Sequence, residues 1–86
     1  MYRITDITKD GETRTDGGYP LRIGSLVEII FMWVGIPLVL SYLEDADGNK
    51  KAGFLRTSLI TEVDGDCSSD VIKATTLNSI YTLTKA

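Results

Sequence analysis

The 86-residue chain contains no histidine and only one cysteine, Cys67. Without histidine it cannot build a histidine general base, a Ser-His-Asp or Cys-His nucleophile, a zinc finger or a haem-type histidine ligand from its own residues. One sulfur atom cannot form a disulfide within the chain, and the carboxylates next to Cys67 disfavour a reactive thiolate. We therefore expect a protein that is not an enzyme and that holds no metal or cofactor.

Basic residues are also few. Nine Lys and Arg residues stand against twelve Asp and Glu residues, for a formal net charge of -3. Phosphate neutralisation supplies most of the affinity of nucleic-acid binders, so direct nucleic-acid binding is not expected. The acidic stretch 62–70 is interpreted as a solvated loop rather than as a phosphate mimic. The first residues lack the apolar core of a signal peptide, which together with the lone cysteine favours a cytoplasmic location.

Strong helix formers are scarce. Alanine is found four times and glutamine never, whereas threonine, isoleucine and valine together number 24. Asp-Gly pairs, which favour tight turns between antiparallel strands, are found four times. This composition predicts an all-β fold. Because so short a chain covers two separate sheets only thinly, we expect a single small antiparallel barrel, SH3-like or OB-like, with six to seven short strands.

The turn markers divide the chain into strand-length segments. Strands are expected at 2–8, 21–32, 37–43, 51–55, 59–63, 71–75 and 79–84. Gly24 and Ser25 are expected to bend the second strand. Thr57 and Ser58 are expected to form a turn between the fourth and fifth strands, and Asn78 to take the left-handed position in the last hairpin.

The segment 26–43 has Glu28 as its only charged residue. Its length approaches that of a membrane helix. Its many β-branched residues, with Gly35 and Pro37 between them, favour a buried hairpin instead. A membrane anchor through this segment remains an alternative, and it predicts a helix in detergent.

This hairpin does not alternate apolar and polar residues as a strand on a solvated sheet does. Leu26, Glu28, Ile30 and Met32 fall on one face of its first strand, and Val27, Ile29, Phe31 and Trp33 on the other. A barrel interior covers only one face. The outer face is covered either by the N-terminal segment, with Tyr2, Ile4 and Ile7, or by another protein chain.

Cover from within the chain is hardest to arrange at the tip of the hairpin. Met and Trp are also favoured at contact surfaces, and large exposed apolar patches usually mark contact sites. We therefore expect an interface with a protein partner or with a second copy of the chain. Its predicted residues are Phe31, Met32, Trp33 and Ile36.

Two polar segments are compared with known kinds of ligand site. Residues 45–49 resemble part of an EF-hand calcium loop, but Lys50 and Arg56 stand where that loop requires glycine and a bidentate carboxylate, so a hairpin turn is preferred. Arg56, Thr57, Asn78 and Tyr81 either bond local backbone or gather at one barrel rim to hold a small anionic ligand such as a nucleotide, with the Arg56 fork as anchor.

The Thr57-Ser58 turn and the closing pattern Thr76-x-Asn78-Ser79-x-Tyr81 resemble short β-rich proteins of bacteria and their phages. The resemblance covers about the second half of the chain and carries no activity with it. The two-faced apolar hairpin and the absence of catalytic groups lead us to expect a non-enzymatic binding module that acts by protein contact. The small size of the chain and this resemblance suggest a phage-type inhibitor or anti-defence accessory protein.

Overall fold

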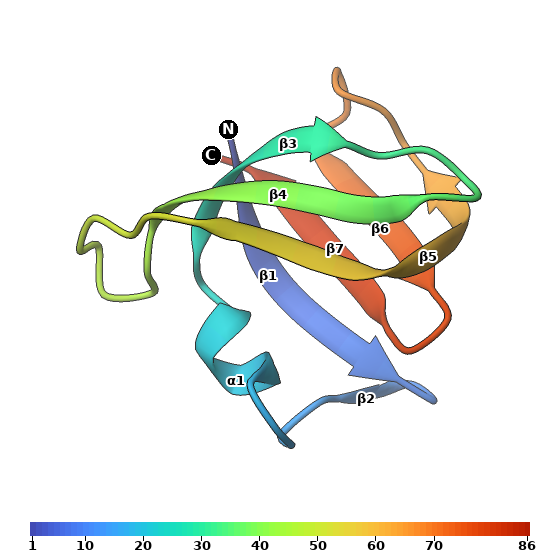
Figure 1. Cartoon of the computed structure of the whole chain (residues 1–86), viewed down its shortest axis with the longest axis horizontal. Helices are drawn as coiled ribbons and strands as arrows, with labels where there is room; N and C mark the ends of the chain where they lie inside the picture. Colours follow the sequence, from blue (N-terminus) through green and yellow to red (C-terminus); the bar gives the residue numbers. More distant parts are fainter.

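Every strand of the molecule pairs with antiparallel neighbours, and the sheet closes on itself (Figure 1). The computed structural model describes all 86 residues. Its elements are β1 (Tyr2–Lys9), β2 (Glu12–Thr13), α1 (Tyr19–Arg22), β3 (Leu26–Phe31), β4 (Pro37–Glu44), β5 (Phe54–Asp64), β6 (Val71–Thr76) and β7 (Ile80–Lys85). Six strands follow one another around the barrel in the order β1-β3-β4-β5-β6-β7, while β2 extends the sheet beside β1. The small all-β barrel predicted from the sequence is confirmed.

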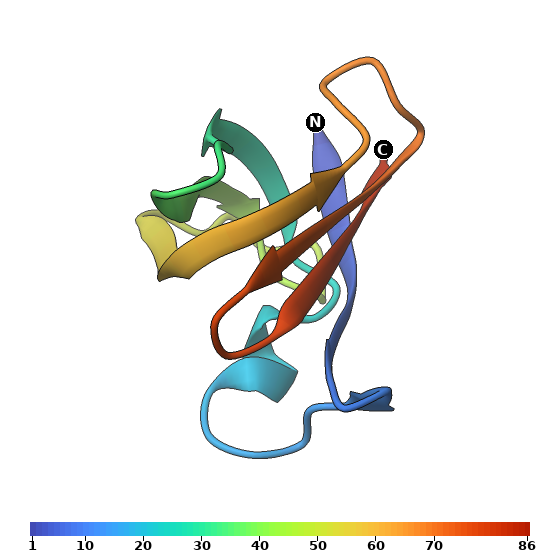
Figure 2. The same ribbon diagram turned by 90° about the vertical axis from the view of Figure 1, so that its right-hand side faces the viewer.

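Strand β1 closes the barrel because it pairs on both sides. Its start pairs with β3 through Tyr2 and Arg3, and its length from Tyr2 to Thr8 pairs with β7. The amide of Ala86 donates to the carbonyl of Met1 at 3.1 Å, so the two termini lie side by side (Figures 1 and 2). Strand β1 therefore links the two ends of the strand order and closes the sheet.

The interior of the barrel holds one apolar core. Its twelve buried residues are Tyr2, Ile4, Ile7, Val27, Leu38, Leu40, Leu55, Ile60, Ile72, Ala74, Tyr81 and Leu83. The apolar side chains of β1 are therefore used to complete the interior. They do not cover the outer face of the 26–43 hairpin, so that alternative is wrong.

The hairpin itself is formed as predicted, by β3, β4 and the turn between them. No helix of the molecule has the length and apolarity needed to span a membrane.

A bulge in β3 changes which face of the sheet each residue of the hairpin occupies. Ile29 pairs with Leu40 but Phe31 pairs with Val39, so β3 carries one extra residue. One inserted residue reverses the side-chain alternation. Phe31 consequently lies on the outer face instead of sharing the inner face with Ile29.

Strand β5 also differs from the prediction. The two short strands expected at 51–55 and 59–63 are one continuous strand, and Thr57 and Ser58 form a bulge rather than a turn. Pro37 pairs with Leu59 and Val39 with Arg56, which leaves one extra residue on β5. The hydroxyl of Thr57 accepts a hydrogen bond from the amide of Leu38 at 3.0 Å, in place of a backbone carbonyl.

The chain before β3 is a short helix and not the beginning of the strand predicted for 21–32. Pro20 lies in the first turn of α1, where its missing N–H costs little. Gly24 then turns the chain with a φ of 93°, a conformation that favours glycine. A Cβ atom at Gly24 would lie 2.8 Å from the Cβ of Ala46, so the loop after β4 packs directly on this glycine.

The turn between β6 and β7 needs no left-handed residue. Asp10 is the one non-glycine residue with a positive φ, so the prediction for Asn78 is wrong. The Thr76 hydroxyl closes the turn: it donates to the carbonyl of Ser79 at 2.9 Å and accepts from the Ser79 amide at 3.1 Å. A threonine side chain bonding nearby backbone thus replaces the glycine-like conformation.

Replacing Gly24 with alanine tests the close approach to Ala46. Positive φ costs an alanine about 1–2 kcal/mol, and the Cβ contact adds about 1–3 kcal/mol of overpacking. The control is Gly48→Ala, which has a φ of 84° but no atom within 4 Å of the added Cβ. Urea unfolding is expected to show a clearly larger loss of unfolding free energy for Gly24→Ala. Equal losses in the two variants would contradict the packing argument.

Candidate functional site

The outer side of β3, β4 and β5 carries a continuous group of exposed apolar side chains, here called the outer apolar face. Its exposed members are Phe31, Trp33, Ile36 and Phe54, and the half-buried Val39 lies among them. The Phe31 and Trp33 rings lie 5.8 Å apart, and Trp33 is 60% exposed and Phe54 69% exposed. Phe31, Ile36, Pro37, Val39, Phe54 and Arg56 line a shallow hollow of about 380 Å³.

The strand register places this face in two rows across the sheet. Glu28 pairs with Ser41, which pairs with Phe54. Phe31 pairs with Val39, which pairs with Arg56. Exposed Glu28 and exposed Arg56 therefore lie at opposite corners of an otherwise mostly apolar block.

Three of the four predicted interface residues lie on this face. Phe31, Trp33 and Ile36 are exposed, whereas Met32 is half-buried and packs against the core. The bulge in β3 explains the difference, because it turns Met32 inward when Phe31 turns outward. Phe54 was not predicted, because nothing in the local sequence indicates that it follows Ser41 in the register.

The four residues predicted as a ligand site also come together, in a second hollow of about 220 Å³, here called the polar hollow. Its lining residues come from α1, β5, β6, β7 and the β6–β7 turn, and α1 and this turn lie in the lower half of Figure 1. Its lining consists of Tyr19, Arg22, Arg56, Thr57, Ser58, Thr76, Asn78 and Tyr81. Tyr19 and Arg22 were missed because the sequence assigned this region to a connection and a strand.

The floor of the polar hollow is organised by Arg22 and Tyr81. An Nη1 hydrogen of Arg22 is donated to the Tyr81 hydroxyl oxygen at 2.8 Å. Burial raises the pKa of the Tyr81 phenol, and the nearby Arg22 cation only partly opposes this rise. Tyr81 therefore stays protonated at neutral pH, and its own O–H remains available as a donor.

Thr57 has little left to offer a ligand. Its hydroxyl accepts from the Leu38 amide and donates to the Ser58 carbonyl at 2.8 Å. This is the local backbone bonding weighed as the alternative for this residue. By contrast, the buried hydroxyl of Ser58 has no hydrogen-bond partner. An unpaired buried hydroxyl is costly, so Ser58 is the polar group here that most lacks a partner.

Arg14 braces the neighbouring turn. It forms a two-pronged ion pair with Asp16, with the atoms Nη2 and Oδ2 2.6 Å apart, and it donates to the Asn78 carbonyl and the Ser79 hydroxyl at 3.0 Å. Its guanidinium also lies 3.9 Å from the centre of the Tyr19 ring. Arg14 is therefore already neutralised and serves to position the rim of the polar hollow.

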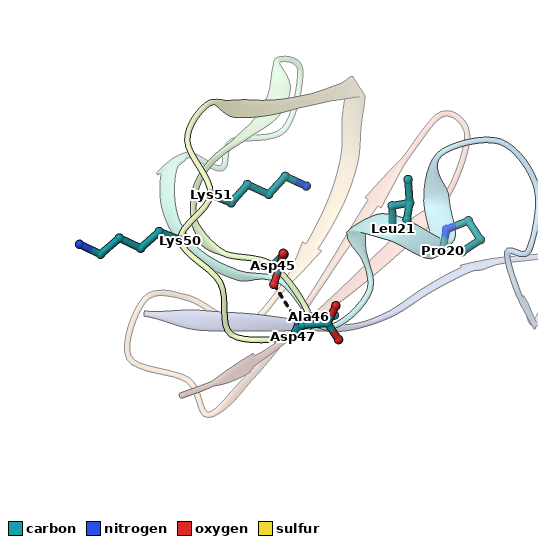
Figure 3. Close-up of a pocket in the computed structure, with 7 residues that line it drawn as sticks. All are labelled: Pro20, Leu21, Asp45, Ala46, Asp47, Lys50 and Lys51. Atoms are coloured by element: carbon teal, nitrogen blue, oxygen red, sulfur yellow. Dashed lines mark hydrogen bonds between the residues drawn. The ribbon is translucent and has the colours of Figure 1, made fainter.

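A third hollow, of about 440 Å³, lies between α1 and the loop after β4 (Figure 3). The Asp45 carboxylate accepts the amides of Asp47 and Asn49 at 2.9 and 3.0 Å, so it holds its own loop. The Lys51 ammonium lies 4.0 Å from the centre of the Tyr42 ring, and Figure 3 shows Lys50 pointing away. No three His, Cys, Asp or Glu side chains lie close enough to share a metal ion.

Comparison with protein-family models, with curated proteins and with solved structures finds no match for this chain. Any assignment of function therefore depends on the geometry of the outer apolar face, of the polar hollow and of the hollow between α1 and the loop after β4.

The Arg14–Asp16 pair gives a pH-dependent prediction. The hydrogen bond from Arg14 lowers the pKa of the Asp16 carboxyl. The stabilising pair is therefore present at neutral pH and is lost as the pH falls through this lowered pKa. Carbon-detected NMR is expected to show Asp16 titrating below the ordinary range of aspartate. In Arg14→Gln the midpoint should return toward that range, and an unchanged midpoint would contradict the pairing.

Proposed function

We propose that this chain is a non-enzymatic binding module that acts by protein contact through the outer apolar face. The single observation that supports it is the group of exposed aromatic and aliphatic side chains around the hollow on β3, β4 and β5. Leaving a large apolar side chain in water forgoes about 1.5–3 kcal/mol of burial free energy. Contiguous exposed patches of this kind mark contact sites on small soluble domains.

The occupant we propose is a second copy of the chain, because the face is complementary to itself in charge. Glu28 and Arg56 lie at opposite corners of the block, and neither forms an ion pair within its own chain. A twofold axis along the Phe31–Phe54 diagonal places Glu28 of each copy opposite Arg56 of the other. The same axis brings the Phe31 rings of the two copies together, and likewise the Phe54 rings.

The size of the chain fits this arrangement. A standard interface buries about 800 Å² on each partner, roughly a sixth of the 5038 Å² exposed here. The exposed apolar side chains on the outer side of the barrel supply the contact surface for such an interface. Sharing an apolar surface also stabilises a chain whose own core is small. The inhibitory or anti-defence role expected from the sequence stays a prediction.

Phe31→Ser tests the contact surface. Removing this ring is expected to raise the dimer dissociation constant about tenfold or more, the range of a hot-spot residue. Sedimentation equilibrium measures the constant directly. The matched control is Leu77→Ser, an exposed side chain (65%) on the β6–β7 turn, which should leave association unchanged. A wild-type chain that stays monomeric at high concentration would contradict the proposal.

Charge reversal tests the relative orientation of the two copies. Glu28→Arg and Arg56→Glu are each expected to weaken association, because like charges then face one another. The double variant Glu28→Arg/Arg56→Glu restores opposite charges at both corners and should recover most of the affinity. If both single variants associate as the wild type does, the proposed twofold arrangement is wrong.

A further inference from the structure

The polar hollow concentrates positive charge in a chain that is acidic overall. Its lining includes two guanidinium groups, Arg22 and Arg56, and no carboxylate. The only ion pair of the molecule joins Arg14 to Asp16, so neither of these two arginines is neutralised by a neighbour. Two unpaired arginines beside one small hollow, in a chain of net charge -3, indicate a site for an anion.

The hydrogen-bond donors that the lining residues leave free also favour an anion. Arg22 donates one N–H to Tyr81 and has others free, and Arg56 donates to no protein group. Tyr81 accepts that bond and keeps its own O–H to donate. The side-chain amide of Asn78, at the rim, makes no hydrogen bond to the protein. The free donors of the lining therefore exceed its free acceptors.

We propose that the polar hollow binds a phosphate-type dianion, either inorganic phosphate or the phosphate of a small monoester. Arg22 and Arg56 supply charged forks that match two oxygen atoms each. The Tyr81 hydroxyl and the Asn78 amide are placed to donate to the remaining oxygens. This site is separate from the outer apolar face, although Arg56 borders both hollows.

The size of the hollow limits the ligand. Pockets that enclose drug-sized molecules measure about 300–1,000 Å³, whereas this one measures about 220 Å³. The aromatic ring of its lining best placed for stacking, Tyr19, already lies under the guanidinium groups of Arg14 and Arg22, at 3.9 and 4.7 Å. A phosphate group fits this space, and a nucleobase has neither the room nor a free ring to stack on.

The test is a titration with sodium phosphate at constant ionic strength, followed by the NMR signals of the arginine Nε–H groups. Saturable shifts are expected for Arg22 and Arg56, and sodium chloride should produce none. Arg22→Gln and Arg56→Gln should each raise the dissociation constant about tenfold, the usual effect of losing one charged hydrogen-bonding partner. The matched control is Lys73→Gln, which removes one exposed positive charge from β6 and should leave binding unchanged.

Several results would overturn the proposal. Absence of saturable binding by about 50 mM phosphate removes the site. An equal loss of binding in Lys73→Gln means that only the overall charge matters. If Arg22→Gln fails to fold, Arg56→Gln, at an exposed strand position, still decides the question. All titrations are repeated in Phe31→Ser, so a failure of the proposed dimer leaves this test intact.

Further arms of the same titration identify the source of the phosphate group. O-phosphoserine and glycerol phosphate represent small monoesters, and AMP represents a nucleotide. Binding of inorganic phosphate or a small monoester supports the proposal, with AMP no tighter than either. Binding of AMP more than about tenfold tighter than phosphate would contradict the size argument.

Discussion

The closure of the barrel through β1 is the constraint on which the other features depend. Because β1 pairs with both β3 and β7, the sheet has one enclosed side, and the core is limited to what that side holds. All other apolar side chains have to lie outside. The interior is too small for all the apolar residues of the chain, so some aromatic rings are exposed. The exposed rings and aliphatic side chains are concentrated around the hairpin of β3 and β4.

Bulges decide which side chains take part in each surface. The extra residue in β3 turns Phe31 outward, and the extra residue in β5 places Arg56 at the border between two hollows. Both bulges lie in strands of the closed barrel, a setting in which bulges are common. The same geometric requirement that encloses the core thus also shapes the outer apolar face and the polar hollow.

The sequence predicted the parts of the fold that depend on local pattern. Strands β1, β4, β6 and β7 were found because their composition and flanking turn residues are readable along the chain. The bulges were not, because an extra residue is specified by pairing between distant strands. Asn78 was misassigned for a related reason: the hydroxyl of Thr76 closes the turn, so no left-handed residue is needed.

The candidate sites divide in the same way. Arg56, Thr57, Asn78 and Tyr81 line one hollow, although the sequence placed Arg56 and Thr57 between two strands and not within the continuous β5. Arg22 was missed because a four-residue helix has no periodicity to detect. Phe54 was missed because its place on the outer apolar face follows from its pairing with Ser41 on β4, which the local sequence does not reveal.

The position of Arg56 has a thermodynamic consequence. Its guanidinium borders both the polar hollow and the hollow on the outer apolar face, so in the two arrangements we propose it would have to serve Glu28 of a second copy and an anion at the same time. Thermodynamic linkage is reciprocal. If anion binding weakens self-association by some factor, self-association weakens anion binding by the same factor. In the arrangement we propose, this single side chain would make self-association depend on the anion concentration of the surrounding solution.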